Sequence, residues 1–286
     1  MQLIKYFFQF LIIIFFFLVF KLIGYKKATM FGSFIGSFFG PFFRSKKLIT
    51  SNITRAMPLI SSDQILEIHK KMWSNYGRVL SDYIFIKNFR KNTLSKHLKI
   101  EGSEILENIK KNKSPVIFIS GHFINFELMA MEIEKSGIKL ATIYRPLNNI
   151  FINYVMEHIR KKYICKNQIK KGISGIRQML NLYKKDYSIA LMIDQRVSEG
   201  VKSNFFNKPA LTTTIPAQLV KKFNCKIVPI YIQSVDKFNY KLTVNNPINF
   251  EKNETIQSIT DKLNIILEKM ILKNPEQWIW SHNRWK

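Results

Sequence analysis

A long apolar run at the amino terminus constrains this chain more than any other feature. Residues Tyr6 to Phe20 contain a single polar side chain, Gln9, and after Lys21 the run continues for three more residues. About 18 residues at roughly 1.5 Å each reach ~27 Å, which is barely the thickness of a bilayer's hydrocarbon core. A cleaved signal peptide is the competing interpretation, but no small-residue cleavage site follows the run. The run therefore predicts an uncleaved membrane anchor.

The basic residues that flank this run predict its orientation. More of them follow the run than precede it, where only Lys5 and the amino terminus are positive. Positively charged flanks favour the cytoplasmic side, so we expect a single-pass anchor with the rest of the chain in the cytoplasm. The basic residues after the start of the run are Lys21, Lys26, Lys27, Arg44, Lys46 and Lys47.

A glycine-rich and phenylalanine-rich segment, residues 31–43, follows the anchor. Its glycines recur every four residues, so a helix here would present a small-residue stripe that lets another helix approach closely. Because Pro41 interrupts the pattern, a flexible aromatic loop is the alternative. We expect a short interfacial or hairpin helix packed on the anchor, and we divide the chain into residues 1–45, anchor and membrane-proximal segment, and residues 46–286. The glycines are Gly32, Gly36 and Gly40, and the phenylalanines left for lipid or core are Phe34, Phe38 and Phe42.

The rest of the chain has the pattern of an α/β domain. Helical periodicity covers Ile49 to Phe85, and from Leu98 onward apolar runs of strand length alternate with helical stretches. This alternation predicts a mostly parallel sheet flanked by helices. The expected strands are Val116–Ile119, Leu140–Tyr144, Ile189–Ile193, Ile227–Ile232 and Tyr240–Val244. The expected helices are Phe126–Lys135, Ile150–Lys162, Gly175–Lys184, Ile215–Phe223 and Thr255–Lys273.

The net charge of the chain, +26, restricts its partners. Such a charge favours an acidic partner: nucleic acid, an anionic membrane surface or an acidic carrier protein. A nucleic-acid binder would cluster its basic and aromatic residues on a recognisable module, whereas lysine is spread throughout this chain. A membrane-tethered, non-catalytic nucleic-acid binder is therefore only a remote alternative, and we expect no nucleic acid as a partner.

His122 stands where an α/β domain places its chemistry. A strand ends near Ser120, a turn carries His122, and a helix begins near Asn125, a suitable N-cap. Ligands of open α/β sheets bind at the carboxyl ends of strands, as in this turn. In a continuous helix His122 and Glu127 would point ~140° apart. With His122 in the turn, we expect the Glu127 carboxylate to fold back and orient the imidazole as a general base. A merely structural or exposed histidine is the alternative.

A metal site is not expected around this histidine. No second histidine or cysteine lies near His122 in the sequence. The two cysteines, Cys165 and Cys225, are 60 positions apart and form no CxxC motif. This spacing argues against both a structural zinc site and a disulfide framework.

Several blocks, taken in order, resemble those of the lipid A biosynthesis acyltransferases of lauroyl and myristoyl type, relatives of the glycerol-phosphate acyltransferases. The resemblance covers nearly the whole chain, and the order and spacing of the blocks carry it. Around Arg145 the chain departs from many members, which have a small residue or glycine near this arginine. The blocks are Gly121–Glu127, similar to an H-x4-D/E motif, Tyr144–Asn149, Asp194–Gln195 with Phe205–Thr212, and the terminal Pro275–Lys286.

This resemblance implies a glycerol-phosphate acyltransferase-like fold and an acyltransferase of the bacterial inner membrane. The enzyme would move a fatty acyl chain from an acyl carrier protein thioester to a hydroxyl of a lipid A precursor, in lipopolysaccharide biosynthesis, without a cofactor. Another membrane lipid, such as a lysophospholipid or an aminolipid, is the alternative acceptor. His122 would be the base and Glu127 its orienting acid. Asp194 follows the expected strand Ile189–Ile193 and should lie on the same sheet edge as His122, either as catalytic support or in a structural role. At the end of the chain, an interfacial or closing element is expected, with packing alone as the alternative, from Trp278, Trp280, Arg284 and Trp285. The expected substrate contacts are Arg145, Asn148, Asp194, Gln195 and Thr212.

Overall fold

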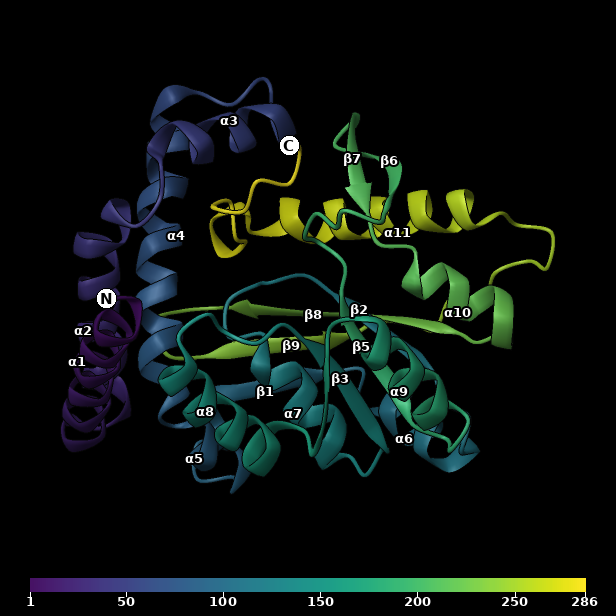
Figure 1. Cartoon of the computed structure of the whole chain (residues 1–286), viewed down its shortest axis with the longest axis horizontal. Helices are drawn as coiled ribbons and strands as arrows, with labels where there is room; N and C mark the ends of the chain where they lie inside the picture. Colours follow the sequence, from purple (N-terminus) through teal and green to yellow (C-terminus); the bar gives the residue numbers. More distant parts are fainter.

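A seven-stranded sheet lies at the centre of the computed structural model, which describes residues 1–286 (Figure 1). Its strand order is β1-β9-β8-β2-β5-β3-β4, and every neighbouring pair is parallel except β8 and β9. The predicted α/β architecture with a mostly parallel sheet is therefore confirmed. The strands are β1 (Leu98–Glu101), β2 (Ile117–Ser120), β3 (Leu140–Tyr144), β4 (Asn167–Lys170), β5 (Ser188–Met192), β8 (Ile227–Ser234) and β9 (Tyr240–Val244).

Helices link the strands and flank the sheet (Figure 1). All four residues of the central strand β2 are buried, because helices cover both of its faces. The connecting helices are α5 (Ile86–Arg90), α6 (Ser103–Asn112), α7 (Glu127–Lys135), α8 (Ile150–Ile159), α9 (Ile173–Tyr183), α10 (Ile215–Phe223) and α11 (Ile256–Lys273). The last turn of α8 continues as a π-helix, η3 (Arg160–Ile164).

A small hairpin and the carboxyl terminus form a second layer above the sheet in Figure 1. The hairpin pairs β6 (Val201–Phe205) with β7 (Lys208–Thr212) in antiparallel register and packs on α11. After α11 and a short 3₁₀ turn, η4 (Pro275–Gln277), the chain runs back across the molecule. We call residues 275–286 the C-terminal strap.

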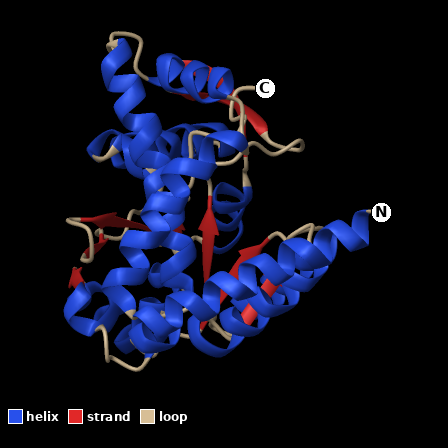
Figure 2. Ribbon diagram, turned by 90° about the vertical axis from the view of Figure 1, so that its left-hand side faces the viewer, coloured by secondary structure: helices blue, strands red, loops and turns tan.

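The amino terminus is the expected apolar helix, α1 (Gln2–Ile23). It is 22 residues long, with a mean hydropathy of 2.5 and only 11% of its apolar window buried, so it meets the requirements of a membrane-spanning helix. Figure 2, which faces this side of the molecule, shows the amino terminus projecting away from the body. Three further elements follow α1: α2 (Tyr25–Phe39), the 3₁₀ turn η1 (Gly40–Phe42) and α3 (Lys46–Ala56).

The glycine stripe of α2 faces α4 (Ser62–Tyr83) rather than the anchor. A Cβ added to Gly32 would lie 2.5 Å from the Gly77 carbonyl oxygen, and one added to Gly36 would lie 2.3 Å from the Trp73 carbonyl oxygen. The close helix approach predicted from the glycine spacing is confirmed. The expectation that this helix packs on the anchor is also confirmed, because Phe31 of α2 contacts the Phe16 and Phe20 rings of α1, while the glycine stripe itself faces α4.

Candidate active site

The central pair of parallel strands brings His122 and Asp194 together. Ser120 at the end of β2 is in register with Met192 at the end of β5, so each polar residue lies two positions beyond its strand. The His122 Nδ1 atom lies 2.8 Å from one Asp194 carboxylate oxygen, and the His122 backbone N–H donates to the other at 2.8 Å. The shared sheet edge expected for these residues is confirmed, and their side chains form a direct histidine–carboxylate pair at this edge.

The environment of this pair favours its charged form. Asp194 is fully buried, whereas the His122 side chain keeps 25% of its surface exposed. Burial opposes protonation of His122, but the Asp194 carboxylate outweighs this effect and raises the pKa of the imidazole. Burial also opposes the charge on Asp194, yet His122 and a bond from the Trp278 indole N–H (2.9 Å) lower the pKa of Asp194 to about 2. The carboxylate is therefore ionised at neutral pH.

Glu127 does not make the contact with His122 that the sequence predicts. Its carboxylate instead accepts from Arg160, whose Nε and Nη2 atoms lie 2.7 and 2.5 Å from the same Glu127 oxygen. Both side chains are largely buried, with 13% of Arg160 and 9% of Glu127 exposed. The prediction that Glu127 folds back onto the imidazole is wrong in this structure, because Asp194 already occupies Nδ1 and Arg160 holds Glu127.

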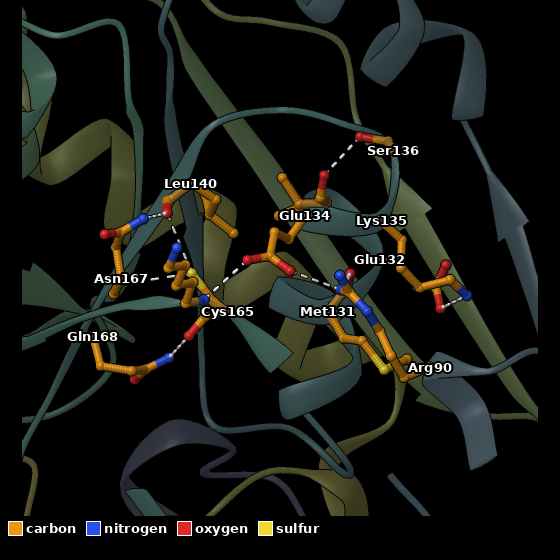
Figure 3. A network of polar contacts seen from close by, with 12 residues as sticks. Arg90, Met131, Glu132, Glu134, Lys135, Ser136, Leu140, Cys165, Asn167 and Gln168 are labelled. Atoms are coloured by element: carbon orange, nitrogen blue, oxygen red, sulfur yellow. Dashed lines mark hydrogen bonds and ion pairs between the residues drawn. The ribbon is translucent and has the colours of Figure 1, made fainter. Parts of the chain in front are cut away.

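A polar network fixes the relative positions of α7 and η3, the elements that carry Glu127 and Arg160 (Figure 3). At the far end of α7, Glu134 pairs with Arg90 of α5 at 2.8 Å and accepts from the Lys166 backbone N–H at 2.9 Å. Cys165, directly after η3, donates to the Leu140 carbonyl of β3. These bonds hold the end of α7 beside the residues that follow η3, so the Glu127–Arg160 distance is set by the fold.

The turn between His122 and α7 has a different geometry from the one expected. Asn125 is not the N-cap of α7, because Phe126 takes that position. Asn125 instead adopts a left-handed backbone conformation (φ 48°), and its amide donates to the buried Asp82 of α4 at 3.2 Å. Asp82 also accepts from Thr29 of α2 and Tyr240 of β9. The catalytic turn is thereby tied to the first helices and to the sheet.

The other predicted site residues are spread more widely. Arg145 and Asn148 are exposed in the loop between β3 and α8, and neither side chain contacts His122. Gln195 is partly exposed beside Asp194. Thr212 is buried, and its hydroxyl accepts from Arg284 at 2.7 Å. Thr212 therefore anchors the C-terminal strap, and its expected contact with substrate stays a prediction.

The strap closes over the catalytic turn. The Ile124 backbone N–H donates to the Gln277 carbonyl at 3.0 Å, and Phe123 forms a β-bridge with Trp278. Arg284 is completely buried and lies over the Phe205 ring at 4.8 Å. The tryptophans and arginine at the end of the chain therefore form the closing element that the sequence suggested, and they shield one side of Asp194 from water.

Two residues of the site carry no role in the sequence prediction. Arg160 falls inside the predicted helix Ile150–Lys162, and nothing in the local pattern connects it to Glu127, which lies 33 positions away. Trp278 belongs to a recognised block, but its indole bond to Asp194 joins residues 84 positions apart. In contrast, His122 and Asp194 each follow a predicted strand, and this position in the sequence indicated that the two residues lie on one edge of the sheet.

This arrangement suits proton transfer at His122. With its Nδ1 proton donated to Asp194, the neutral imidazole leaves Nε2 free to take a proton, and Asp194 stabilises the imidazolium that forms. The Phe126 ring lies edge-on to the imidazole at 5.1 Å and limits the access of water. The structure has no group of three or more histidine, cysteine or acidic side chains placed to hold a metal ion.

Comparison with known proteins gives one family. Residues 1–286 match the family model described as bacterial lipid A biosynthesis acyltransferase. The lipid A biosynthesis palmitoleoyltransferase of Escherichia coli is 22% identical over 267 residues, 92% of this chain and 86% of that protein. The lauroyltransferase of the same organism is 22% identical over 251 residues, covering 85% and 79%. A lipid A biosynthesis acyltransferase of Haemophilus influenzae is 25% identical over 204 residues, covering 68% and 62%.

Proposed function

Because this chain belongs to the bacterial lipid A biosynthesis acyltransferase family, we propose that it transfers a fatty acyl chain from an acyl carrier protein thioester to a hydroxyl of a lipid A precursor. The observation that carries the mechanism is the Asp194-bonded imidazole of His122 at the carboxyl edge of the sheet. The proposal includes a glycerol-phosphate acyltransferase-like arrangement of this sheet. It also places the domain on the cytoplasmic side of the inner membrane.

The proposed reaction uses His122 first as a base and then as an acid. Its Nε2 atom takes the proton of the acceptor hydroxyl as the oxygen attacks the thioester carbonyl. The tetrahedral intermediate collapses, so that a C–O ester bond replaces the C–S bond, and the leaving thiolate takes the proton back from His122. Asp194 holds the imidazole in place during both transfers. The negative charge of Glu127 adds to that of Asp194 in raising the pKa of the imidazole, whereas the positive charge of Arg160 opposes it.

A basic groove supports an acidic carrier protein as the donor. The groove has a volume of about 750 Å³ and no apolar side chain other than Pro58 in its lining. Four cations line it, and none of them has an acidic partner within the chain, so they are free to meet the charges of another molecule. The cations are Lys46, Lys47 and Arg55 of α3 and Lys208 of β7.

The groove also lies close to the catalytic machinery. Asn52, on the same helix α3, donates to the Trp280 and His282 carbonyls of the strap, both at 2.8 Å. A carrier protein seated on α3 would therefore rest beside the element that closes over His122. Arg145 and Asn148 remain proposed contacts for the phosphates of the acceptor, since both side chains are exposed and unpaired.

Charge reversal in the groove tests the donor. We expect Lys46→Glu with Lys47→Glu to raise the KM for an acyl carrier protein thioester at least tenfold and to leave the KM for a small acyl thioester unchanged. The matched control for net charge is the double variant Lys184→Glu with Lys185→Glu, at the end of helix α9 and distant from the groove. Equal effects of the two double variants on the carrier-protein KM would remove this support.

The central test is transfer itself. Purified protein in lipid is given labelled acyl carrier protein thioester and a lipid A precursor, and mass spectrometry identifies the acylated product. We expect His122→Ala to abolish transfer while the variant remains folded in membranes. The exposed His158→Ala is the matched control and should retain activity. Near-normal turnover by His122→Ala would contradict the mechanism. Exclusive acylation of a lysophospholipid would favour the alternative acceptor.

A further inference from the structure

The first half of helix α8 is uncharged, yet none of the residues of α8 is fully buried. The sequence from Ile150 to Met156 contains no charged side chain, and no residue of α8 is buried. Ile150 is 54% exposed and Tyr154 is 77% exposed. An uncharged helix this exposed is unusual on a water-facing surface, where apolar side chains gather only in limited patches. The elements that neighbour α8 indicate what this apolar surface faces.

The first turn of α8 lies against the membrane helix α1. The Phe151 ring contacts the rings of Phe7 and Phe10, with centroids 5.6 and 5.9 Å apart. Asn149, the N-cap of α8, donates to the Tyr6 carbonyl at 2.8 Å. If α1 is in lipid, as its length and composition allow, the start of α8 lies beside lipid along the amino-terminal half of α1.

The two asparagine side chains in this part of the chain are hydrogen-bonded, as lipid exposure demands. The Asn149 side chain caps the Phe151 and Ile152 backbone N–H groups, and its amide reaches α1. Asn153 accepts from the Leu147 backbone N–H at 2.8 Å and donates to Glu157 at 2.9 Å. Unpaired polar groups are costly in hydrocarbon, so this pairing removes the main obstacle to insertion.

Charge divides α8 into two halves. All charged side chains lie in the second half and its continuation η3, from Glu157 through Arg160 to Lys162. The uncharged first half is seven residues, or about 10 Å of helix, so this length of α8 can lie beside α1 without placing a charge in hydrocarbon. Tyr154 lies near the middle of this half, and tyrosine is favoured where hydrocarbon meets headgroups.

We propose that the first half of α8, residues 150–156, inserts into the lipid bilayer beside α1. The other end of α8 leads into η3, where Arg160 pairs with Glu127. A single helix therefore connects the bilayer to the catalytic turn. Resting on the proposed function, this gives the acceptor lipid a path along α8 from the bilayer to His122.

A depth measurement tests the insertion without any assay of activity. An environment-sensitive fluorophore is attached to Cys in Tyr154→Cys, and the protein is bound to phosphatidylethanolamine and phosphatidylglycerol vesicles, with or without brominated acyl chains. The native cysteines are both buried, and the parent protein checks that they stay unlabelled. Lys252→Cys, in the exposed loop before α11, is the control.

We expect a blue shift and quenching by brominated chains for the label at position 154, and neither for the label at position 252. Flotation confirms that both proteins are bound. A label at position 154 that stays in water while the protein floats with the vesicles would overturn the proposal. Insertion with no acyl transfer by the parent protein would leave the proposal standing and count against the proposed function alone.

A charged side chain placed on α8 tests whether the acceptor lipid moves along this helix to His122. We expect Tyr154→Lys to reduce transfer at least tenfold when the acceptor is in a bilayer and to leave it unchanged when the acceptor is in detergent micelles. Equal rates for Tyr154→Lys and the parent in bilayers would contradict the path. A loss of equal size in micelles would also contradict it, since the substitution would then act on the catalytic centre.

Discussion

Asp194 accepts hydrogen bonds from three donors: the ring and the backbone of His122 and the indole of Trp278. These bonds stabilise the carboxylate more than the acid, and the carboxylate in turn stabilises the imidazolium of His122. In the proposed mechanism only neutral His122 can accept a proton, so the acidic limb of the rate profile would report its raised pKa. We therefore expect the rate to fall as the pH drops through a value above the ordinary 6.5 of histidine.

Replacing Asp194 with Asn separates these effects. Removal of the negative charge lowers the pKa of His122, so we expect the acidic limb of kcat/KM to move to lower pH in Asp194→Asn. The plateau should fall by roughly 10²–10⁴-fold, because the imidazole loses its orienting acceptor and the imidazolium its counter-charge. The measurement is kcat/KM between pH 5 and 9. An unmoved limb with full activity would show that Asp194 does not act on His122.

The Glu127–Arg160 pair makes a second prediction at this scale. Because both side chains are largely buried, removing either one leaves a charge without its partner. We expect Glu127→Ala and Arg160→Ala each to lower the free energy of unfolding by about 3 kcal/mol, and the double variant to lose less than the sum. Chemical denaturation in detergent gives all three values. Strict additivity would show that the pair contributes no coupling.

The activities of the same variants show whether Glu127 and Arg160 only stabilise the fold or take part in the reaction. If Glu127 and Arg160 only position α7 against η3, the rates of the three variants should follow their stabilities. A double variant that regains stability but stays inactive would instead place Glu127 in the reaction, as the resemblance to the H-x4-D/E motif implied.

The sequence identified part of this site, and its failures have a physical cause. His122 and Asp194 were found on one edge because parallel strands end together, a rule that needs only strand positions. The partner of Glu127 was missed because Arg160 lies 33 positions away in the π-helix η3, which packs on α7, and no periodicity in the sequence marks that contact. The position of Asn125 was missed because its amide bonds with Asp82, a contact set by tertiary structure.

The helices and strands were also predicted only in part from the sequence. Strands β3 and β9 and helix α10 begin and end where the apolar patterns placed them. The edge strands β1 and β4, with sequences LKIE and NQIK, were missed, since each is four residues long and at least half of its residues are polar. The β6–β7 hairpin was also missed, because its residues Phe205 and Phe206 look like a binding motif in isolation and pack on Trp285 in the fold. Short strands depend on their neighbours more than on local sequence.

The contact between α2 and α4 makes a prediction for a whole element. A Cβ on Gly36 would lie 2.3 Å from the Trp73 carbonyl oxygen and 2.7 Å from the Gly77 nitrogen, both backbone atoms that cannot turn away. We therefore expect Gly36→Ala to lower the free energy of unfolding by about 1–3 kcal/mol, although alanine favours the helix. Ser37→Ala, at the next position on α2, is the control and should change stability by less than ~0.5 kcal/mol. Equal stabilities of the two variants would contradict the close packing.

At the scale of the whole molecule, the first helices and the sheet form one hydrophobic core. The Tyr25 hydroxyl of α2 donates to the Phe238 carbonyl at 2.8 Å, and Thr29 donates to Asp82 of α4 at 2.9 Å. Phe17 and Phe20 of α1 belong to the same core. The segment 1–45 is thus part of the folded unit that holds the catalytic turn, and a membrane-bound α1 fixes the orientation of the entire sheet relative to the bilayer.

This arrangement predicts how the protein behaves without its anchor. Deleting residues 2–20 removes the long apolar helix but keeps the exposed rings of η1 and α8, including Phe42 (81% exposed) and Tyr154 (77% exposed). We expect the shortened protein still to float with anionic vesicles, but to be released by alkaline carbonate, which the full-length protein resists. It should also be less stable, since the buried Phe17 and Phe20 are lost and truncating each core phenylalanine costs about 3–5 kcal/mol. With uncharged phosphatidylcholine vesicles, which do not attract the basic surface, Tyr154→Lys in the shortened protein should abolish flotation, because the remaining apolar attachment is small enough for one buried charge to outweigh it. A shortened protein that never binds vesicles would mean that α1 alone holds this enzyme at the membrane.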